Sequence, residues 1–437
     1  MANERTKFAL LLLTLSLLFA GDAWRNSTGW WVFGVLAIGL ALASIWLLFV
    51  QRDRVHVGSL PYMLMAFLAL ATASLAWSQY RLATLVGLGT TAILVATGLA
   101  VAINYSWAEI LRGMSVVLRL IIGLSLLFEL FVSAVLRRPL EPFFLPPGIS
   151  LDFETFPKML YWSRNELFDV FNEGRIQGII GNANNLGFLA LFAAIAVSLQ
   201  LADRTISRPT GIFWLVTIGA TIVFTRSATV TVAFVGVALV VAAVLVVRRA
   251  STPRARTLAY TGIFAGLAIA TVLVLTFASR ILELLGKSPD LTGRLGIWEK
   301  VIELAQERPV FGWGWVSLWV PWAQPFDELA FRNGVRQLQA HNVWIDLWFQ
   351  LGIVGLLVFA ALVVTTMSRS WSFAVDRPQT SPHGSAAYTA LQLLPLLLLS
   401  ALVIQSVAES RLILEFGFFF LMVIAIKTKR PDSVMGL

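Results

Sequence analysis

The sequence predicts an all-α polytopic membrane protein with about twelve transmembrane helices. Of its 437 residues, 58% are hydrophobic and only 13% are charged, and the mean hydropathy is +0.80. Soluble domains average about 45–50% apolar and about 25% charged residues. The apolar residues also gather in long runs, and about 20 apolar residues are needed to cross a bilayer as a helix. Membrane helices therefore account for the size of the chain without several soluble domains.

Twelve apolar runs follow one another along the chain. The first, seventh and last are marginal, because a span needs at least about 17 residues. The first run follows a basic start and precedes Gly21-Asp22-Ala23, so a cleaved signal peptide is an alternative to a first helix. The runs lie at residues 8–24, 29–50, 58–77, 83–104, 115–136, 183–202, 211–225, 228–247, 258–279, 343–367, 386–407 and 412–426.

The distribution of basic residues predicts the orientation of the helices. Cytoplasmic loops of membrane proteins are enriched in Lys and Arg. With a cytoplasmic amino terminus, the four short outer loops carry one arginine each, and the inner loops carry more. The outer arginines are Arg25, Arg81, Arg226 and Arg411, and a single inner loop holds Arg248, Arg249, Arg254 and Arg256. We therefore expect an inner-membrane protein with both termini in the cytoplasm. This distribution explains the net charge of +9 without nucleic acid as a partner.

The predicted topology divides the chain into three parts. Residues 1–279 hold helices one to nine and a first external loop near 137–182. Residues 280–341 form a long external loop that we expect to be catalytic, and residues 342–437 hold helices ten to twelve and a cytoplasmic tail. Within the long loop, apolar residues at helical spacing predict an amphipathic helix that ends near Arg308-Pro309. They are Leu295, Trp298, Val301, Ile302 and Ala305.

The sequence lacks the residues that several classes of chemistry require. The chain has no cysteine, which excludes disulfides, thiol nucleophiles and thiolate metal sites. The GWGW cluster lacks the strand, lysine and helix of a nucleotide-binding loop. The three histidines are predicted on two sides of the membrane, so they cannot form a shared metal site. We therefore expect no cofactor and no resident metal.

Three residues near the outer membrane boundary are the main candidates for chemistry. Arg226 lies in a tight outer connection, where it either anchors to lipid headgroups or binds an anion. Arg294 begins the amphipathic helix, where free backbone N–H groups favour a phosphate, although a solvated side chain is the alternative. His341 precedes the tenth run, and a neutral imidazole there serves either as a general base or as a structural residue.

Aromatic and acidic residues give weaker signals. A group of tryptophans in the long loop either stacks against sugar rings or anchors the loop at the membrane interface. Asp152 and Glu154 offer two carboxylates to a divalent cation. Glu129 and Glu415 fall in predicted helices. A carboxylate there either takes part in the function of the protein or pairs one helix with another. The tryptophans are Trp313, Trp315, Trp319 and Trp322.

Three asparagines precede the sixth run. Asn182, Asn184 and Asn185 lie in GIIGNANNLGF. Asparagine is a preferred residue at the start of a helix, because its side-chain oxygen accepts a hydrogen bond from a free backbone N–H. We therefore prefer helix capping to ligand binding for this group.

At these residues the chain resembles the O-antigen ligase superfamily, which includes O-antigen and exopolysaccharide polymerases. The most specific match is His341-Asn342, nine residues, then Gly352 and Gly355, which follows the family's His-Asn-x9-Gly-x-x-Gly pattern. TGRLGIW and RPVFGWGW resemble the start of the family's long external loop, and TRSAT resembles its earlier Arg-Ser motif. The motifs span about residues 180–370.

The resemblance implies a membrane glycosyltransferase of the GT-C type. The donor would be an undecaprenyl-pyrophosphate-linked glycan, and the acceptor a hydroxyl of a glycan, lipid or cell-wall polymer, with inversion and without a metal. Arg226 and Arg294 would hold the pyrophosphate, and His341 would orient or deprotonate the acceptor. The further candidates for substrate binding are Asn342, Arg411, Arg308, Trp313 and Trp315.

Three other functions compete with this interpretation. A secondary transporter favours repeated halves and broken helices at midplane, whereas these candidates gather at the outer rim. A flippase would move the same lipid-linked glycan without breaking a bond. A metal-dependent GT-C enzyme would use Asp152 and Glu154.

Overall fold

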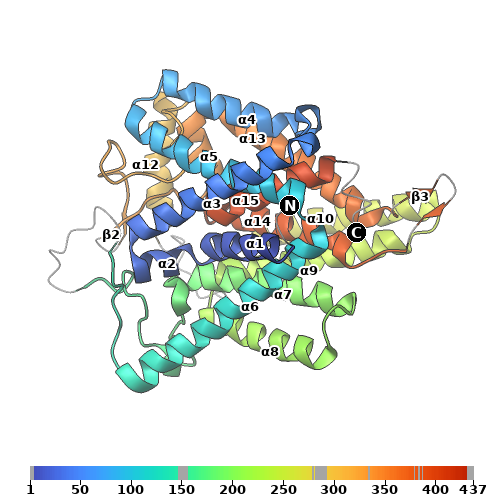
Figure 1. Ribbon diagram of the computed structural model, residues 1–437, viewed down its shortest axis with the longest axis horizontal. Coiled ribbons are helices and arrows are strands. Elements are labelled where there is room, and N and C mark those ends of the chain that lie inside the picture. Colours follow the sequence, from blue (N-terminus) through green and yellow to red (C-terminus); the bar gives the residue numbers. More distant parts are fainter. Residues whose placement is uncertain are drawn as a thin grey trace.

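The structure is a computed structural model that describes residues 4–145, 156–277, 280, 293–332, 335–377, 379–381, 384–385 and 387–430. The described residues are mostly helical (Figure 1). The first six helices are α1 (Glu4–Phe19), α2 (Gly21–Thr28), α3 (Trp30–Val50), α4 (Tyr62–Ala73), α5 (Arg81–Asn104) and α6 (Trp107–Phe131). Those that follow are α7 (Ala183–Ala202), α8 (Arg208–Thr225), α9 (Ala228–Arg249), α10 (Pro253–Thr276), α12 (Arg294–Glu307), α13 (Val343–Val375), α14 (Leu394–Gln405) and α15 (Glu415–Lys429).

The remaining elements are short. Two hairpins pair β1 (Phe331–Arg332) with β2 (Val335–Arg336), and β3 (Gln379–Ser381) with β4 (Gly384–Ser385). Single turns extend or connect the helices, among them η3 (Ser74–Ala76), η4 (Val132–Leu136), η6 (Gly178–Ile180), η7 (Leu391–Leu393) and η8 (Arg411–Ile413). The all-α prediction is thus confirmed for the described part of the chain.

Each of the twelve apolar runs contains a helix, but not all of these helices have the length of a span. Within the described residues, eight helices are long and apolar enough to cross a membrane, or nine if the bent pair α1 and α2 is counted as one. The axes of that pair differ by 81°. The helices α4 and α14 are shorter because the ends of their apolar runs form single turns and non-helical segments. Hydropathy identifies runs of apolar residues, but it does not show where a helix within such a run begins or ends.

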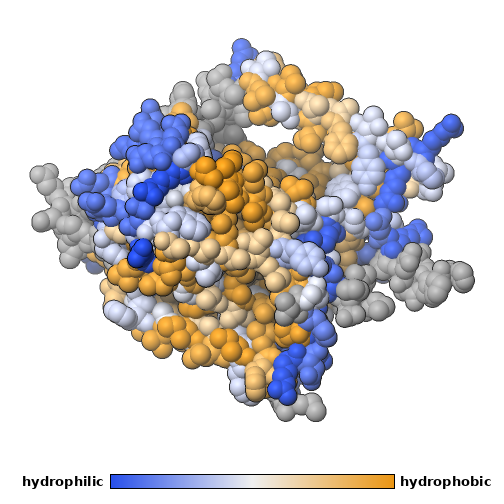
Figure 2. All heavy atoms as spheres, turned by 90° about the horizontal axis from the view of Figure 1, so that it is seen from above, coloured by the Kyte–Doolittle hydropathy of each residue, from blue (hydrophilic) through white to orange (hydrophobic). Residues whose placement is uncertain are grey.

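The centre of the bundle is built around α7 and α15. In α7, 78% of the apolar window is buried, whereas none of the corresponding window of α10 is. Aromatic rings join α1 to both central helices, because Phe19 stacks on Phe420 of α15 at 5.6 Å and lies edge-on to Phe192 of α7 at 6.3 Å. Apolar residues also cover broad areas of the surface, and hydrophilic residues gather mainly towards the two ends of the long axis (Figure 2). This pattern is typical of a polytopic membrane protein.

The two ends of the chain lie at the same end of the bundle, away from α12 and the β1–β2 hairpin (Figure 1). Tyr105 links them, because its hydroxyl donates to the Lys7 carbonyl at 2.7 Å and its own carbonyl accepts from Lys427 Nζ at 2.7 Å. The described residues after α10 that hold α12 and the β1–β2 hairpin, and the described residues just before α7, lie at the opposite end (Figure 1).

Glu129 fastens the segment between α6 and α7 to the bundle. Its carboxylate is buried and accepts from the Ser163 hydroxyl at 2.7 Å and from the backbone N–H groups of Gln177 and Gly178 at 2.8 and 2.7 Å. A buried carboxylate is tolerated where several donors satisfy it. The role of Glu129 in this structure is therefore to position the outer segment.

The helix α13 is interrupted at Gly352, and the segment Arg308–Trp315 docks at the break. Gly352 has φ 66° and ψ −170°, which leaves neighbouring backbone groups without helical partners. The loop supplies them, since Trp313 N–H and Gly314 N–H donate to the carbonyls of Phe349 and Gln350 at 3.0 and 2.9 Å. In return Ile353 N–H donates to the Pro309 carbonyl at 2.8 Å. The break thus ties the segment Arg308–Trp315 to α13.

We expect Gly352→Ala to lower the unfolding temperature of the purified protein in detergent. The backbone conformation at Gly352 is one that only glycine adopts readily, and a side chain there costs about 1–3 kcal/mol. An added Cβ would also lie 2.2 Å from the Val310 carbonyl carbon. The matched control is Gly219→Ala inside α8, where a Cβ meets nothing within 4 Å. An unfolding temperature equal to the wild-type value for Gly352→Ala would contradict the docking role.

Candidate active site

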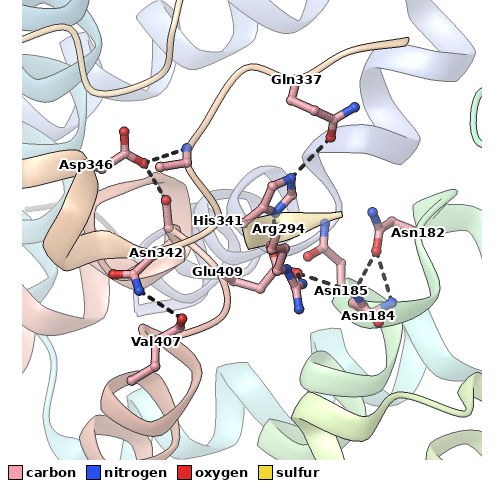
Figure 3. Close-up of polar contacts among 12 residues, drawn as sticks. Asn182, Asn184, Asn185, Arg294, Gln337, His341, Asn342, Asp346, Val407 and Glu409 are labelled. Atoms are coloured by element: carbon pink, nitrogen blue, oxygen red, sulfur yellow. Dashed lines mark hydrogen bonds and ion pairs between the residues drawn. The ribbon is translucent and has the colours of Figure 1, made fainter. Parts of the chain in front are cut away.

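A buried carboxylate, Glu409, joins two of the three main candidates. Its Oε2 lies 2.8 Å from His341 Nδ1, and its Oε1 accepts from an Arg294 guanidinium nitrogen at 2.7 Å (Figure 3). Asn184 Nδ2 also donates to Oε1, at 3.3 Å. The groups come from the start of α12, the residue pair before α13, the start of α7 and the loop after α14. Residues far apart in the sequence thus converge on one charge.

The environment of Glu409 keeps it ionised. Burial by itself would raise the pKa of this carboxyl, but the charge and hydrogen bond of His341, with the charges of Arg294 and Arg411, outweigh burial and lower the pKa to about 2. A buried charge is stable only when it is paired in this way. Glu409 is therefore a fixed negative centre between two basic groups.

The ring of His341 is held on both sides. Opposite Nδ1, the ring Nε2 lies 3.2 Å from Gln337 Oε1. The amide nitrogen of Gln337 donates to the Val335 carbonyl at 2.9 Å, which turns its oxygen towards the ring. Both contacts are hydrogen bonds when both ring nitrogens carry a proton, whereas a neutral ring leaves one nitrogen as an acceptor. Because Glu409 favours a proton on Nδ1, a neutral ring carries its lone pair on Nε2, on the side of Gln337.

The first turn of α13 fixes the loop that carries Glu409. Asn342 caps the helix by accepting from Trp344 N–H and Ile345 N–H, and its Nδ2 donates to the Val407 carbonyl at 3.1 Å (Figure 3). Asp346, one turn later, accepts from the Ser410 hydroxyl and from Trp319 Nε1. Asn342 therefore positions Glu409 rather than contacting the cavity described next.

A cavity of about 320 Å³ opens beside this cluster. It shares Arg294 and Asn184 with the cluster, and its other walls come from the starts of α7 and α9, the segment between α6 and α7, and β1. The residues that line it are Lys158, Met159, Arg164, Arg175, Gln177, Gly181, Asn182, Ala183, Asn184, Ala228, Thr229, Arg294 and Arg332. Five of them are basic and none is acidic, so the cavity suits an anion.

Arg226 lies next to the cavity without lining it. The residue ends α8 in a left-handed conformation, is exposed, and donates to the Val170 carbonyl at 3.3 Å. Its charge acts on Arg175, which lines the cavity. The adjoining Ser227 hydroxyl donates to Asn184 Oδ1 at 3.0 Å. The structure therefore brings all three main candidates to one region, with Arg226 at its edge.

The other predicted binding residues lie elsewhere. Arg308 is exposed and lies over the ring of Trp313 at 5.3 Å, beside a second hollow with Trp77. Trp315 is fully buried, with its Nε1 donating to the Thr91 hydroxyl at 3.0 Å, so it does not reach the cavity. Arg411 pairs with Glu415 and acts on the cluster only through its charge.

The structure bears on some of the remaining sequence-based hypotheses and not on others. The Asn182 side chain caps α7 by accepting from the N–H groups of Asn184 and Asn185 at 3.0 and 3.1 Å, as expected. Glu415 pairs with Arg25 at 2.8 Å and with Arg411, which agrees with helix pairing. Asp152 and Glu154 lie outside the described residues.

Sequence reasoning missed Glu409, Gln337 and Arg175. Glu409 is an isolated carboxylate in the loop VAESRL, and no spacing relates it to His341. Arg175 and Gln337 lie in irregular segments, where periodicity carries no information. Two observations could have pointed to these residues. All three were predicted on the outer side, and two basic groups at a buried site require an acid between them.

Comparison with known proteins finds similarity over part of the chain. Residues 213–360, which include Arg226, Arg294 and His341, match the family model described as O-antigen ligase. The chain is also 27% identical over 204 residues to the exopolysaccharide production protein ExoQ of Rhizobium meliloti (strain 1021), a match that covers 43% of this chain and 45% of that protein. The aligned region thus spans less than half of the relative's length. The chain is thus similar to the O-antigen ligase family over residues 213–360 and to an exopolysaccharide production protein over 204 residues.

Proposed function

We propose that this protein transfers a glycan from an undecaprenyl-pyrophosphate carrier to an acceptor hydroxyl at the outer face of the inner membrane. The observation that carries the proposal is the buried Glu409 carboxylate, which joins His341 to Arg294 beside a basic cavity. A hydroxyl-activating group and an anion-binding group are the two parts that such a transfer needs. The acceptor is a glycan, a lipid or a cell-wall polymer, and both ligase and polymerase reactions fit the site.

Arg294 and Arg226 supply the pyrophosphate contacts in this proposal. Arg294 keeps a buried N–H, at Nε, that has no acceptor among the described residues. A substrate oxygen would satisfy it. As the glycosidic bond breaks, negative charge grows on the pyrophosphate, and arginine is suited to neutralise it because its planar group donates several parallel hydrogen bonds.

His341 serves the acceptor. The acceptor oxygen forms a bond to the anomeric carbon from the face opposite the pyrophosphate, and the bond from that carbon to the pyrophosphate oxygen breaks with its electron pair. The acceptor proton passes to Nε2 of a neutral His341, whose contact with Gln337 is exchanged for the acceptor. Throughout, Nδ1–H donates to Glu409 and the charge of the carboxylate stabilises the imidazolium that forms. Inversion at the anomeric carbon follows.

We expect His341→Ala, Arg226→Ala and Arg294→Ala each to lower the rate of transfer by ~100-fold or more, since a positioned base or a charge-stabilising donor contributes about that much. The measurement is release of a labelled glycan from its undecaprenyl-pyrophosphate carrier by protein in nanodiscs, with a panel of acceptors. The control is Arg138→Gln, which removes an exposed outer charge that does not line the cavity. Carrier-linked glycan that crosses the bilayer of proteoliposomes, with no transfer product, would make the protein a flippase or transporter instead.

We expect the stability of the folded protein to fall as the pH decreases from about 4.5 to about 2. The pKa of Glu409 is lowered from 4.5 to about 2 in the folded state, so its contribution is complete above 4.5 and is lost on protonation near the lower value. The contribution is on the order of 3 kcal/mol. Unfolding temperatures measured across this range should show the loss in wild type and in the exposed control Glu328→Gln, but less of it in Glu409→Gln. Identical profiles for both variants would contradict the assignment.

We expect chelation to leave the rate of transfer unchanged. Among the described residues, no group of three or more His, Cys, Asp or Glu side chains is placed to hold a metal ion, and the proposed charge stabilisation comes from arginine. The measurement is transfer before and after EDTA treatment. Loss of activity that a divalent cation restores would favour the alternative metal-dependent enzyme that uses Asp152 and Glu154.

A further inference from the structure

The cavity holds more positive charge than the pyrophosphate contacts account for. Arg294 pairs with Glu409, but none of the ion pairs formed within the described part of the chain involves Lys158, Arg164 or Arg175. Arg175 donates to the neutral oxygens of Thr225 and Asn184, both at 2.9 Å, and Arg164 Nε donates to the Lys158 carbonyl at 2.9 Å. These three residues all come from the segment between α6 and α7.

The concentration of these charges is unfavourable in the empty cavity. Burial lowers the pKa of Arg175, and the neighbouring charge of Arg164 lowers it further. The Glu166 carboxylate accepts from the Arg175 backbone N–H at 3.0 Å, and its charge offsets part of this effect on Arg175 and Arg164. Like charges that are only partly compensated at a partly buried site favour the binding of an anion, because the anion reduces the repulsion.

Neutral polar groups lie between the cations. The amide nitrogen of Asn182, the amide oxygen of Gln177 and the hydroxyl of Thr229 line the cavity and make no hydrogen bond to other described residues. Such groups match the hydroxyls of a sugar, whereas the cations match a carboxylate or phosphate. The pyrophosphate itself offers acceptors but no hydroxyls, so it would leave the Gln177 amide oxygen without a donor, whereas a sugar hydroxyl would supply one.

We propose that this cavity binds acidic sugars, so that the glycan handled by the enzyme carries anionic residues such as uronic acids. The Lys158, Arg164 and Arg175 side chains bind the acidic groups, and the neutral lining binds the adjoining hydroxyls. The inference rests on the proposed function for its catalytic meaning, but the binding it describes does not require turnover.

The test is direct binding of two soluble probes to the protein in nanodiscs. One probe is a short oligogalacturonate, and the other is the same oligosaccharide with its carboxylates reduced to alcohols. We expect the acidic probe to bind wild type at least ~10-fold more tightly, and more weakly as salt is added, because salt screens the charges. We expect the double variant Lys158→Gln with Arg164→Gln to lose this preference, and the control Arg138→Gln to keep it. Both substitutions are in the segment between α6 and α7. If the double variant folds poorly, the single variant Lys158→Gln takes its place, because it removes an exposed charge.

Two results would overturn the inference. Equal binding of both probes to wild type would show that the cavity does not select acidic sugars. If instead the double variant loses binding of inorganic pyrophosphate but keeps the preference for oligogalacturonate, these cations bind the pyrophosphate of the carrier and not the acidic sugar. A selective cavity in a protein that transfers no glycan would refute only the proposed function, whereas transfer without selectivity would refute only this inference.

Discussion

The site depends on one buried charge, the Glu409 carboxylate. Without it, Arg294 and His341 would lie close together as two basic groups with no acid between them. With Glu409 present, Arg294 and His341 contact different oxygens of the same carboxylate, at 2.7 and 2.8 Å. The carboxylate also favours one tautomer of the histidine. A single acid thus sets the distance, orientation and charge of the groups on either side.

The second carboxylate near the site has a different function. Asp346 is buried and takes its hydrogen bonds from neutral donors, namely Trp319 Nε1, the Ser410 hydroxyl and the Ala340 N–H. It joins the outer loop, the start of α13 and the loop after α14. Together with the break at Gly352, it makes the first turns of α13 the support of the outer layer. The family pattern around His341 and Gly352 therefore has a structural explanation, since one end of the pattern holds the site and the other holds the loop beside it.

The fold was largely predictable from the sequence, whereas only part of the site was. Hydropathy located every helical region of the bundle, because a lipid-facing helix must be apolar along its length. It predicted about twelve spans, whereas eight or nine of the described helices have the length and composition of a span, and the apolar runs around α4 and α14 include residues that are not helical. Arg226, Arg294 and His341 could be selected from the sequence because they lie at recognisable starts or ends of elements. Glu409 and the basic residues of the cavity lie in irregular segments, where only three-dimensional contacts relate them. Trp315 has the sequence context of a surface aromatic, yet the docking at Gly352 buries it completely.

The walls of the cavity have two origins, and this affects how the protein can change over evolutionary time. The ends of α7, α9 and α12 provide one set of walls, and their positions are constrained by the packing of the membrane bundle. The segment between α6 and α7 provides the other, and it is an irregular connection attached mainly through Glu129 and hydrogen bonds to backbone atoms. Connections of this kind accept substitutions and insertions more readily than helices do. Under the proposed function, a lineage can therefore acquire selectivity for a new polysaccharide by altering this segment, while the proposed catalytic groups stay as they are.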